Sequence, residues 1–411
     1  MSLIVFFIIL VFVYGLFSER IERTVITAPI FFTTAGMLML LFLPEMSANP
    51  DKIEIFLLLA EIGLVLLLFT DASRTDLKIL MNIRSLPTRL LSLGLLLSIL
   101  LGALAAVMVF PGLSIWEAGI LAAILAPTDA GLGQIIVNSP HVPMKIRQAL
   151  NVEAGLNDGL SVPFLLFFIA FATVGGEEHS ARLSFFIIQQ LGYGILVGVG
   201  IGLLGGWLLG LAKRKNWMAD SWQQLAVVMV PLCCAVIAET VGASMFIAAF
   251  VAGLAVQIGY KEVGADSIEF TEEWGQLVNL SIFFLFGVLV VLNFQGFNLK
   301  HLLYAVISLT LVRMVPVWIA LMGTGLNRAT VLFMGWFGPR GLASIVLGLV
   351  YLEHATHQSG KTTIQLALML TVLLSIFAHG LSAMPGINIY TRKLATLPSS
   401  APELEEVKTK T

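Results

Sequence analysis

Charge is scarce in this sequence. Only 12% of its 411 residues are Asp, Glu, Lys or Arg, and 58% are hydrophobic, whereas a typical soluble domain carries about 25% charged residues. The mean hydropathy of +0.95 therefore argues against a soluble globular protein and predicts an integral membrane protein. The net charge of −2 argues against nucleic acid as the main partner, because phosphate binding needs an excess of basic residues.

Cysteine and histidine are also rare, and common catalytic motifs are missing. The only two cysteines, Cys233 and Cys234, are adjacent in an apolar run, so we interpret them as packing thiols rather than a disulfide or redox pair. No HExxH, Walker loop or GxSxG occurs, which argues against a membrane protease or an ATP-driven pump. His354 and His357 lack a third ligand, so no resident metal is expected. We expect neither an enzyme nor a cofactor.

Long apolar runs without strand-like alternation predict membrane-spanning helices. We expect an all-α polytopic membrane protein with about thirteen transmembrane helices. Several predicted spans exceed the ~20 residues that cross a bilayer, which indicates tilted or interrupted helices. The predicted spans are residues 2–19, 25–43, 54–70, 86–110, 115–138, 146–173, 183–212, 221–239, 242–259, 272–293, 300–323, 329–353 and 362–386.

Lysine and arginine are distributed unevenly between the predicted loops. With the N-terminus outside, 17 of the 23 fall on the inside, four fall outside, and two, Arg313 and Arg340, lie within spans. Cytoplasmic loops are enriched in these residues. We therefore expect the N-terminus outside, the C-terminus in the cytoplasm, and a bacterial inner (plasma) membrane as the location.

An odd number of spans fits two repeats of six spans joined by a linker. The expected parts are a first repeat at 1–182, a glycine-rich linker span at 183–220, a second repeat at 221–390 and a short cytoplasmic tail at 391–411. An offset of seven spans reverses direction, so the repeats would be inverted. Transporters built this way carry interrupted helices at matching positions near the membrane midplane.

Spans 5 and 12 carry helix breakers at matching positions. Span 5 contains Pro127-Thr128-Asp129, and span 12 contains Gly338-Pro339-Arg340-Gly341. Proline removes a backbone hydrogen bond and glycine lets a helix unwind, so we predict two interrupted helices that cross; two ordinary kinks are the alternative. Half-helix ends carry partial charges. Asp129 would offset them at the N-termini and Arg340 at the C-termini, with the Thr128 carbonyl and hydroxyl as cation ligands.

Span 6 carries two acids and an amide. Glu153 and Asn157 are four residues apart and share a face, whereas Asp158 is turned by about 100° from Asn157. A charged residue at the bilayer centre costs ~2.5–3.5 kcal/mol on insertion scales, so intramembrane acids are functional hypotheses by default. Glu61 and His379 also fall within spans, and their roles stay open.

Charge pairing separates the roles of the acids. Buried charges must be paired or neutralised. If Glu153 pairs with Arg313, and Asp129 and Arg340 serve the interrupted helices, Asp158 has no fixed cation. It must then hold either a proton or a cation, as an exchanger does. A static hydrogen-bond network around Asp158 is the alternative.

The chain resembles the NhaP-type sodium–proton exchanger family over nearly the whole membrane part, in Pro127-Thr128-Asp129, Glu153-x-x-x-Asn157-Asp158, Arg313 and Gly338-Pro339-Arg340-Gly341. The resemblance implies a thirteen-helix inverted-repeat fold with dimer and ion-transport domains, a homodimer and elevator-like alternating access. It also implies that Asp158 binds the ion and the proton, that Glu153 is the salt-bridged acid, and that Asn157 marks the electroneutral branch.

We therefore expect a secondary antiporter that exchanges a monovalent cation, sodium in the first place, for a proton. Its ion site would comprise Asp158, Thr128, Asn157 and Asp129, and a single titrating carboxylate would make the exchange one for one and electroneutral. Ala154 stands where the family has a hydroxyl that can ligate the ion, so potassium/proton exchange is the nearest alternative. A cation channel and a non-transporting ion or pH sensor on the same fold are the alternatives of another class.

Overall fold

The structure is a computed structural model that describes residues 3–22, 24–42, 51–74, 85–173, 185, 188–260, 265–354, 360–398 and 401–404. All regular secondary structure in these ranges is helical. The first half contains α1 (Leu3–Glu22), α2 (Ala28–Phe42), α3 (Asp51–Arg74), α5 (Leu86–Arg89), η2 (Leu90–Gly94), α6 (Leu95–Val109), α7 (Ile115–Leu125), α8 (Ala130–Val137) and α9 (Met144–Thr173).

The second half begins with a π-helical turn and ends with the longest helix of the described chain. Its elements are η4 (Ile188–Tyr193), α11 (Gly194–Arg214), α12 (Asp220–Thr240), α13 (Met245–Gly259), α14 (Ala265–Leu292), η5 (Phe294–Gly296), α15 (Leu299–Leu309), α16 (Leu311–Ala320), α17 (Arg328–Trp336), α18 (Leu342–His354) and α19 (Lys361–Leu394).

Each of the thirteen predicted spans contains a helix or an interrupted pair of helices, so the expected all-α membrane fold is confirmed. Among the described residues, six helices are long and apolar enough to cross a membrane, and five shorter helices are apolar. The number of crossings and the inverted relation of the two halves stay predictions.

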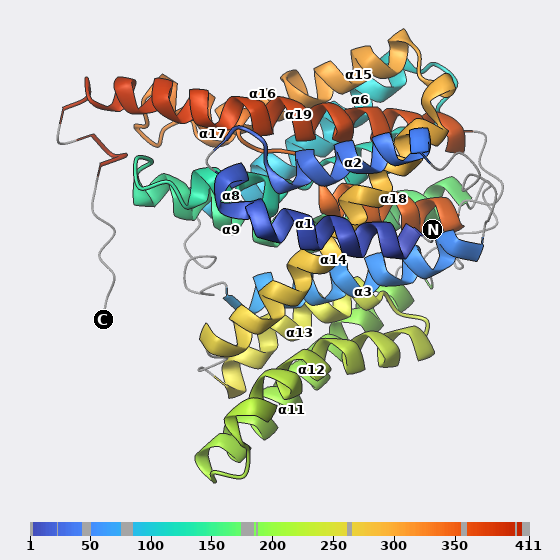
Figure 1. The fold of residues 1–411 in the computed structure, drawn as a ribbon, viewed down its shortest axis with the longest axis vertical. Helices are drawn as coiled ribbons and strands as arrows, with labels where there is room; N and C mark the ends of the chain where they lie inside the picture. Colours follow the sequence, from blue (N-terminus) through green and yellow to red (C-terminus); the bar gives the residue numbers. More distant parts are fainter. Residues whose placement is uncertain are drawn as a thin grey trace.

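The helices form a bundle with two distinct edges. Figure 1 shows α15, α16 and α19 along one edge and α11 and α12 along the opposite edge. The first edge is held by contacts of α15 with α19 and α6, and the second by contacts of α11 and α12 with α13. Helix α9 contacts α3, α7, α8 and α13, so the helix that carries Glu153 and Asp158 is packed from several sides.

Helix α7 is fixed at its first turn by a buried acid. Ser114 Oγ accepts a hydrogen bond from the Glu117 N–H, and Glu117 Oε2 accepts one from the Ser114 N–H at 2.9 Å, which forms a capping box. Glu117 Oε1 also accepts from the Gly360 N–H at 2.9 Å. One carboxylate therefore ties the start of α7 to the residue before α19.

The last described residues pack onto the membrane part. Helix α19 runs on to Leu394, into the segment expected as tail, and Glu403 is only 1% exposed. Its Oε1 accepts hydrogen bonds from the Thr330 hydroxyl at 2.9 Å and from the Asn327 N–H. Lys145 Nζ donates to the Pro402 carbonyl at 2.9 Å. Glu403 thus places a negative charge at the N-terminal end of α17, where the helix dipole favours it.

Helix α11, in the predicted linker, approaches α13 almost backbone to backbone. A Cβ atom at Gly202 would lie 2.7 Å from the Ala252 carbonyl oxygen, and one at Gly198 would lie 2.6 Å from that of Ala248. Small residues that allow such close approach are typical of membrane helix contacts. Glycine is therefore required at these two positions by packing, in a helix where it otherwise lowers helix propensity.

We predict that Gly202→Ala lowers the melting temperature of the purified protein, because overpacking costs about 1–3 kcal/mol. Gly200→Ala is the matched control, since a Cβ there meets nothing within 4 Å and alanine is the better helix former. Thermal unfolding in detergent measures both. Equal melting temperatures in the two variants would contradict the close contact of α11 with α13.

Candidate ion-binding site

The first predicted interruption separates α7 from α8. Residues 126–129 lie outside any helix, as expected from Pro127, which has no N–H to donate. Asp129 is the N-cap of α8, with φ −86° and ψ 119°, and its Oδ1 accepts from the Leu132 N–H at 2.8 Å. The break therefore leaves free carbonyls at the end of α7 and free N–H groups at the start of α8.

The second predicted interruption separates α17 from α18. Phe337 ends α17 with φ −85° and ψ 59°, and the chain returns to helix at Leu342. The two glycines of this break lie against charged side chains. A Cβ at Gly338 would overlap the Arg313 guanidinium, and one at Gly341 would overlap the Asp129 carboxylate. Their lack of a side chain lets both charged groups reach the backbone of the break.

The two interruptions contact each other through backbone and carboxylate. The Asp129 N–H donates to the Pro339 carbonyl at 2.8 Å. Asp129 Oδ2 accepts from the Leu342 N–H at 2.5 Å, while its Oδ1 accepts from the Leu132 N–H. One carboxylate thus caps the N-terminal ends of both α8 and α18, where the partial positive charges of two half-helices meet.

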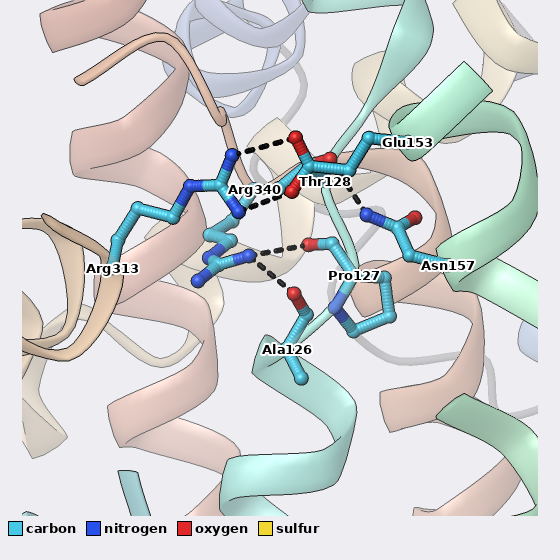
Figure 2. A network of polar contacts seen from close by, with 7 residues as sticks. All are labelled: Ala126, Pro127, Thr128, Glu153, Asn157, Arg313 and Arg340. Atoms are coloured by element: carbon cyan, nitrogen blue, oxygen red, sulfur yellow. Dashed lines mark hydrogen bonds and ion pairs between the residues drawn. The ribbon is translucent and has the colours of Figure 1, made fainter. Parts of the chain in front are cut away.

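The Arg340 side chain binds carbonyl groups at the C-terminal end of α7, on the other side of the first interruption. This side chain is fully buried, and its Nη1 donates to the Pro127 carbonyl at 2.9 Å and to the Ala126 carbonyl (Figure 2). These carbonyls belong to the C-cap residue of α7 and to the residue that follows it. Ser344 Oγ adds a bond to the Ile124 carbonyl at 2.8 Å. The second break therefore satisfies the backbone groups released by the first.

Glu153 and Arg313 form a buried two-pronged ion pair. Arg313 lies in the first turn of α16, and its Nη1 and Nη2 donate to the two carboxylate oxygens of Glu153 at 2.5 and 3.0 Å (Figure 2). Both side chains are at most 5% exposed. Paired geometry of this kind satisfies both charges without water. The Glu153 carboxylate consequently has a fixed cation.

Asn157 connects α9 to the first interruption. Its Nδ2 donates to the Thr128 hydroxyl at 2.7 Å (Figure 2), while its Oδ1 is buried and accepts from no described residue. Asp158 is 4% exposed, and its Oδ1 likewise accepts from no donor in the described part of the chain. Two buried oxygen atoms on adjacent residues thus have no donor among the described residues, and the hydrogen bond of Asn157 to the Thr128 hydroxyl places them near the first interruption.

A pocket lies between α8, the beginning of α9 and the second interruption. Its polar lining comes from Thr128, Asp129 and Glu153, and the other lining residues are Gly133, Ile136, Val137, Leu150, Ala154, Phe337 and Pro339. Asp158 does not line it. Ala154 contributes only a methyl group to the wall, one helical turn before Asp158.

One acid near the site was missed by the sequence analysis. Asp71 lies on α3, and a Cβ at Gly155 would lie 3.2 Å from the Asp71 Cβ. Asp71 therefore packs against the turn of α9 that follows Glu153. The predicted third span ended at residue 70, because the apolar run ends there, and hydropathy gives no signal for an acid in the next turn of the same helix. Glu61 lies earlier on α3.

His379 is buried in α19. It is 2% exposed, and its Nδ1 lies 3.1 Å from the Ser375 hydroxyl. The Ser375 hydroxyl in turn accepts a hydrogen bond from the Arg340 N–H of the second interruption. No group of three or more His, Cys, Asp or Glu side chains suited to a metal ion is present among the described residues.

The sequence model of the transmembrane sodium/hydrogen exchanger family matches residues 6–387. The chain belongs to this family. The family expected from the residues is thereby confirmed.

Relatives of this exchanger-family chain differ in the cations that their names give. It is 27% identical over 305 residues to a Na(+)/H(+) antiporter of Schizosaccharomyces pombe, covering 66% of this chain and 64% of that protein. It is 27% identical over 227 residues to the sodium, potassium, lithium and rubidium/H(+) antiporter of Bacillus subtilis, covering 55% of this chain and 34% of that protein. It is 25% identical over 296 residues to the K(+)/H(+) antiporter NhaP2 of Shewanella baltica, covering 69% of this chain and 49% of that protein. The matches span less than two thirds of the length of these relatives.

The fold of this exchanger-family chain is similar to a solved one. The sodium proton antiporter MjNhaP1 from Methanocaldococcus jannaschii superposes with a TM-score of 0.72 at 19% sequence identity, covering 92% of this chain and 100% of the other. At this identity the similarity establishes the fold alone.

We predict that Glu153→Gln and Arg313→Ala each lower the melting temperature strongly, because removing one partner of a buried ion pair leaves the other charge unpaired at a cost of about 3–5 kcal/mol. Arg328→Ala is the control, since Arg328 is an exposed arginine. Thermal unfolding in detergent compares the three variants. Unchanged melting temperatures for both members of the pair would show that the pair does not stabilise the fold.

Proposed function

We propose that this chain is a secondary antiporter that exchanges a monovalent cation, sodium in the first place, for a proton at Asp158. The observation that carries the proposal is the distribution of partners among three buried acids. Glu153 has Arg313, Asp129 has the N–H groups of Leu132 and Leu342, and Asp158 forms no ion pair with any described residue.

A carboxylate buried without a fixed partner is costly unless it binds a proton or a cation. The two forms are alternatives, because the same oxygen atoms hold either the proton or the metal ion. A group that must change one for the other is what antiport requires. Static neutralisation by hydrogen bonds is disfavoured by the buried Oδ1 of Asp158, which accepts from no described donor.

The neighbouring oxygen atoms suit a hard cation. Thr128 lies at the break and offers a hydroxyl and a carbonyl, and Asn157 offers an Oδ1 with no described donor. We assign Thr128 and Asn157 to the cation shell together with Asp158. Asp129 was a further candidate, but both of its carboxylate oxygens accept N–H groups of the two half-helices. We therefore assign Asp129 and Arg340 to the helix ends.

The larger architecture follows from family membership together with the two interruptions. We propose inverted repeats at 1–182 and 221–390 around a linker at 183–220, with the C-terminal segment 391–411 in the cytoplasm and the N-terminus outside. We also propose a homodimer that works by alternating access in a bacterial inner membrane. One titrating carboxylate per transport cycle gives one-for-one exchange that moves no net charge, in accord with Asn157 rather than a second acid beside Asp158.

Potassium/proton exchange is the second candidate, and Ala154 is the observation that favours it. A methyl group in the pocket wall supplies no oxygen ligand, which favours potassium, because its hydration shell is removed at a lower cost than that of sodium. The relative from Shewanella baltica carries the name K(+)/H(+) antiporter. A channel on the same fold would carry the cation without proton coupling, and a non-transporting sensor would carry no flux at all.

We predict that Asp158→Asn abolishes cation-driven proton movement in proteoliposomes, since the amide cannot carry a proton on and off. Glu239→Gln, at an exposed acid, should retain activity. Because proton and cation compete for one carboxylate, the apparent KM for the cation should rise as pH falls, up to about tenfold per pH unit where protonation dominates.

The membrane potential supplies a further test of the same reaction. An exchange of one cation for one proton should proceed at a rate independent of a clamped potential, because each net charge moved would couple to the potential by about 2.3 kcal/mol per 100 mV. A rate that follows the potential, or activity retained in Asp158→Asn, would contradict the proposed mechanism. Flux without proton coupling would indicate a channel.

We predict that Ala154→Ser lowers the KM for sodium more than that for potassium, because the new hydroxyl adds an oxygen ligand one turn before Asp158. A pH-jump vesicle assay that compares sodium, lithium and potassium in both proteins measures the ratio. Ala154→Cys is the control, because cysteine is similar in size to serine but its sulfur is a poor ligand for an alkali cation. An unchanged sodium-to-potassium ratio in Ala154→Ser would show that residue 154 does not contact the cation.

A further inference from the structure

Helix α19 presents a polar face to the second interruption. Ser375, His379 and Ser382 are spaced by four and three residues, so they lie on one side of the helix. Ser375 and His379 are fully buried and Ser382 is half-buried. Polar side chains placed inside an otherwise apolar helix are costly unless they have partners, and each of these has a contact with the end of α17, with the break, or with its neighbour on α19.

Ser375 holds the backbone of Arg340. The Arg340 N–H lies in the non-helical break and therefore lacks the acceptor that a helix would provide. It donates to Ser375 Oγ at 2.6 Å. A buried N–H needs an acceptor, and here a side chain of another helix supplies it. The position of the Arg340 peptide is thus set by α19 rather than by its own segment.

His379 and Ser382 hold the other side of the same break. His379 Nδ1 lies 3.1 Å from Ser375 Oγ and 3.0 Å from the Ser375 carbonyl, so the imidazole restrains Ser375 in either neutral tautomer. The His379 ring packs against the Trp336 indole with centroids 5.1 Å apart. Trp336 Nε1 donates to Ser382 Oγ at 2.9 Å. Both ends of the break are therefore attached to one face of α19.

The break transmits this position to the first interruption. Pro339 accepts from the Asp129 N–H, and the Arg340 side chain donates to the carbonyls of Ala126 and Pro127. Thr128 lies between these contacts and accepts from Asn157. A displacement of the Arg340 peptide would therefore move the segment that carries Thr128. Binding groups must be held to within about 0.5 Å to keep their affinity.

We propose that Ser375, His379 and Ser382 are positioning residues that hold the second interruption against the first and thereby set the cation affinity of the site. The proposal rests on the proposed function for the location of the cation. It gives His379 a role as a neutral restraint on Ser375. Helix α19 also offers a comparison, because Thr371 is fully buried one turn before Ser375, and its hydroxyl donates to the Ala367 carbonyl of its own helix rather than to any other described element.

The test is the effect of Ser375→Ala on the KM and the maximal rate in proteoliposomes, for sodium and for potassium. We expect the KM for the transported cation to rise about tenfold, as for a buried donor left without its acceptor, with a smaller change in maximal rate. Ser375→Thr keeps the hydroxyl and should restore the KM to near the wild-type value. Thr371→Val removes a buried hydroxyl of the same helix and should leave the KM unchanged.

Trp336→Phe supplies a milder variant in case Ser375→Ala does not fold. It removes the donor to Ser382 but keeps an aromatic ring beside His379, and we expect a smaller rise in KM in the same direction with a melting temperature near that of the wild type. A wild-type KM in folded Ser375→Ala and in Trp336→Phe would overturn the proposal, even if the melting temperature falls, because a merely structural contact changes stability alone.

Cation binding measured without transport separates this proposal from the proposed function. Stabilisation of the detergent-solubilised protein by sodium or potassium reports the affinity. Binding in the wild type without exchange would contradict antiport, while weaker binding in Ser375→Ala would still support the positioning role. Equal binding in both proteins would overturn the positioning role and leave antiport intact. Neither binding nor exchange in the wild type would contradict both.

Discussion

The constraint on which the structure depends is the cost of an unpaired charge or backbone group in a medium without water. This cost is largest at an interrupted helix, since each break leaves carbonyls on one side and N–H groups on the other without helical partners. This chain meets that cost by setting two breaks against each other. Asp129 accepts the N–H groups of both new helix starts, and Arg340 donates to the carbonyls at the end of α7. Each break thus supplies a residue that satisfies the other, so neither is expected to be stable alone.

Once the backbone groups of the two breaks are satisfied, the polar side chains that remain beside them can be assigned to separate roles. Arg313 neutralises Glu153, which leaves Asp158 without an ion pair to any described residue, next to Asn157, which donates to Thr128. The site is consequently defined as much by the pairs around it as by its own residues. Membership of the sodium/hydrogen exchanger family identifies the chain as a transporter, and the similarity to MjNhaP1 establishes its fold.

Much of this arrangement could be predicted from the sequence where the relevant chemistry is local. Pro127 and Pro339 mark the breaks because proline cannot donate to a helix, and the long apolar runs mark the helices. Apart from the Glu153–Arg313 pair, which charge balance and the family resemblance indicate, contacts between partners distant in sequence could not be predicted. Ser375 acts on Arg340, Asp71 packs on Gly155, and the division of the eleventh predicted span at Thr310 places Arg313 at a new helix start. Hydropathy and spacing contain no information on which helix will lie opposite.

The buried carboxylate of Glu403 has a practical consequence for handling the protein. It lies near the C-terminal end of the sequence, yet it accepts hydrogen bonds from Asn327 and Thr330 at the start of α17, and the far end of that helix is the second interruption. An affinity tag or a fluorescent reporter that replaces residues from Ala401 onward would remove this acceptor. Labels and surface attachments should therefore leave the chain intact through Glu403.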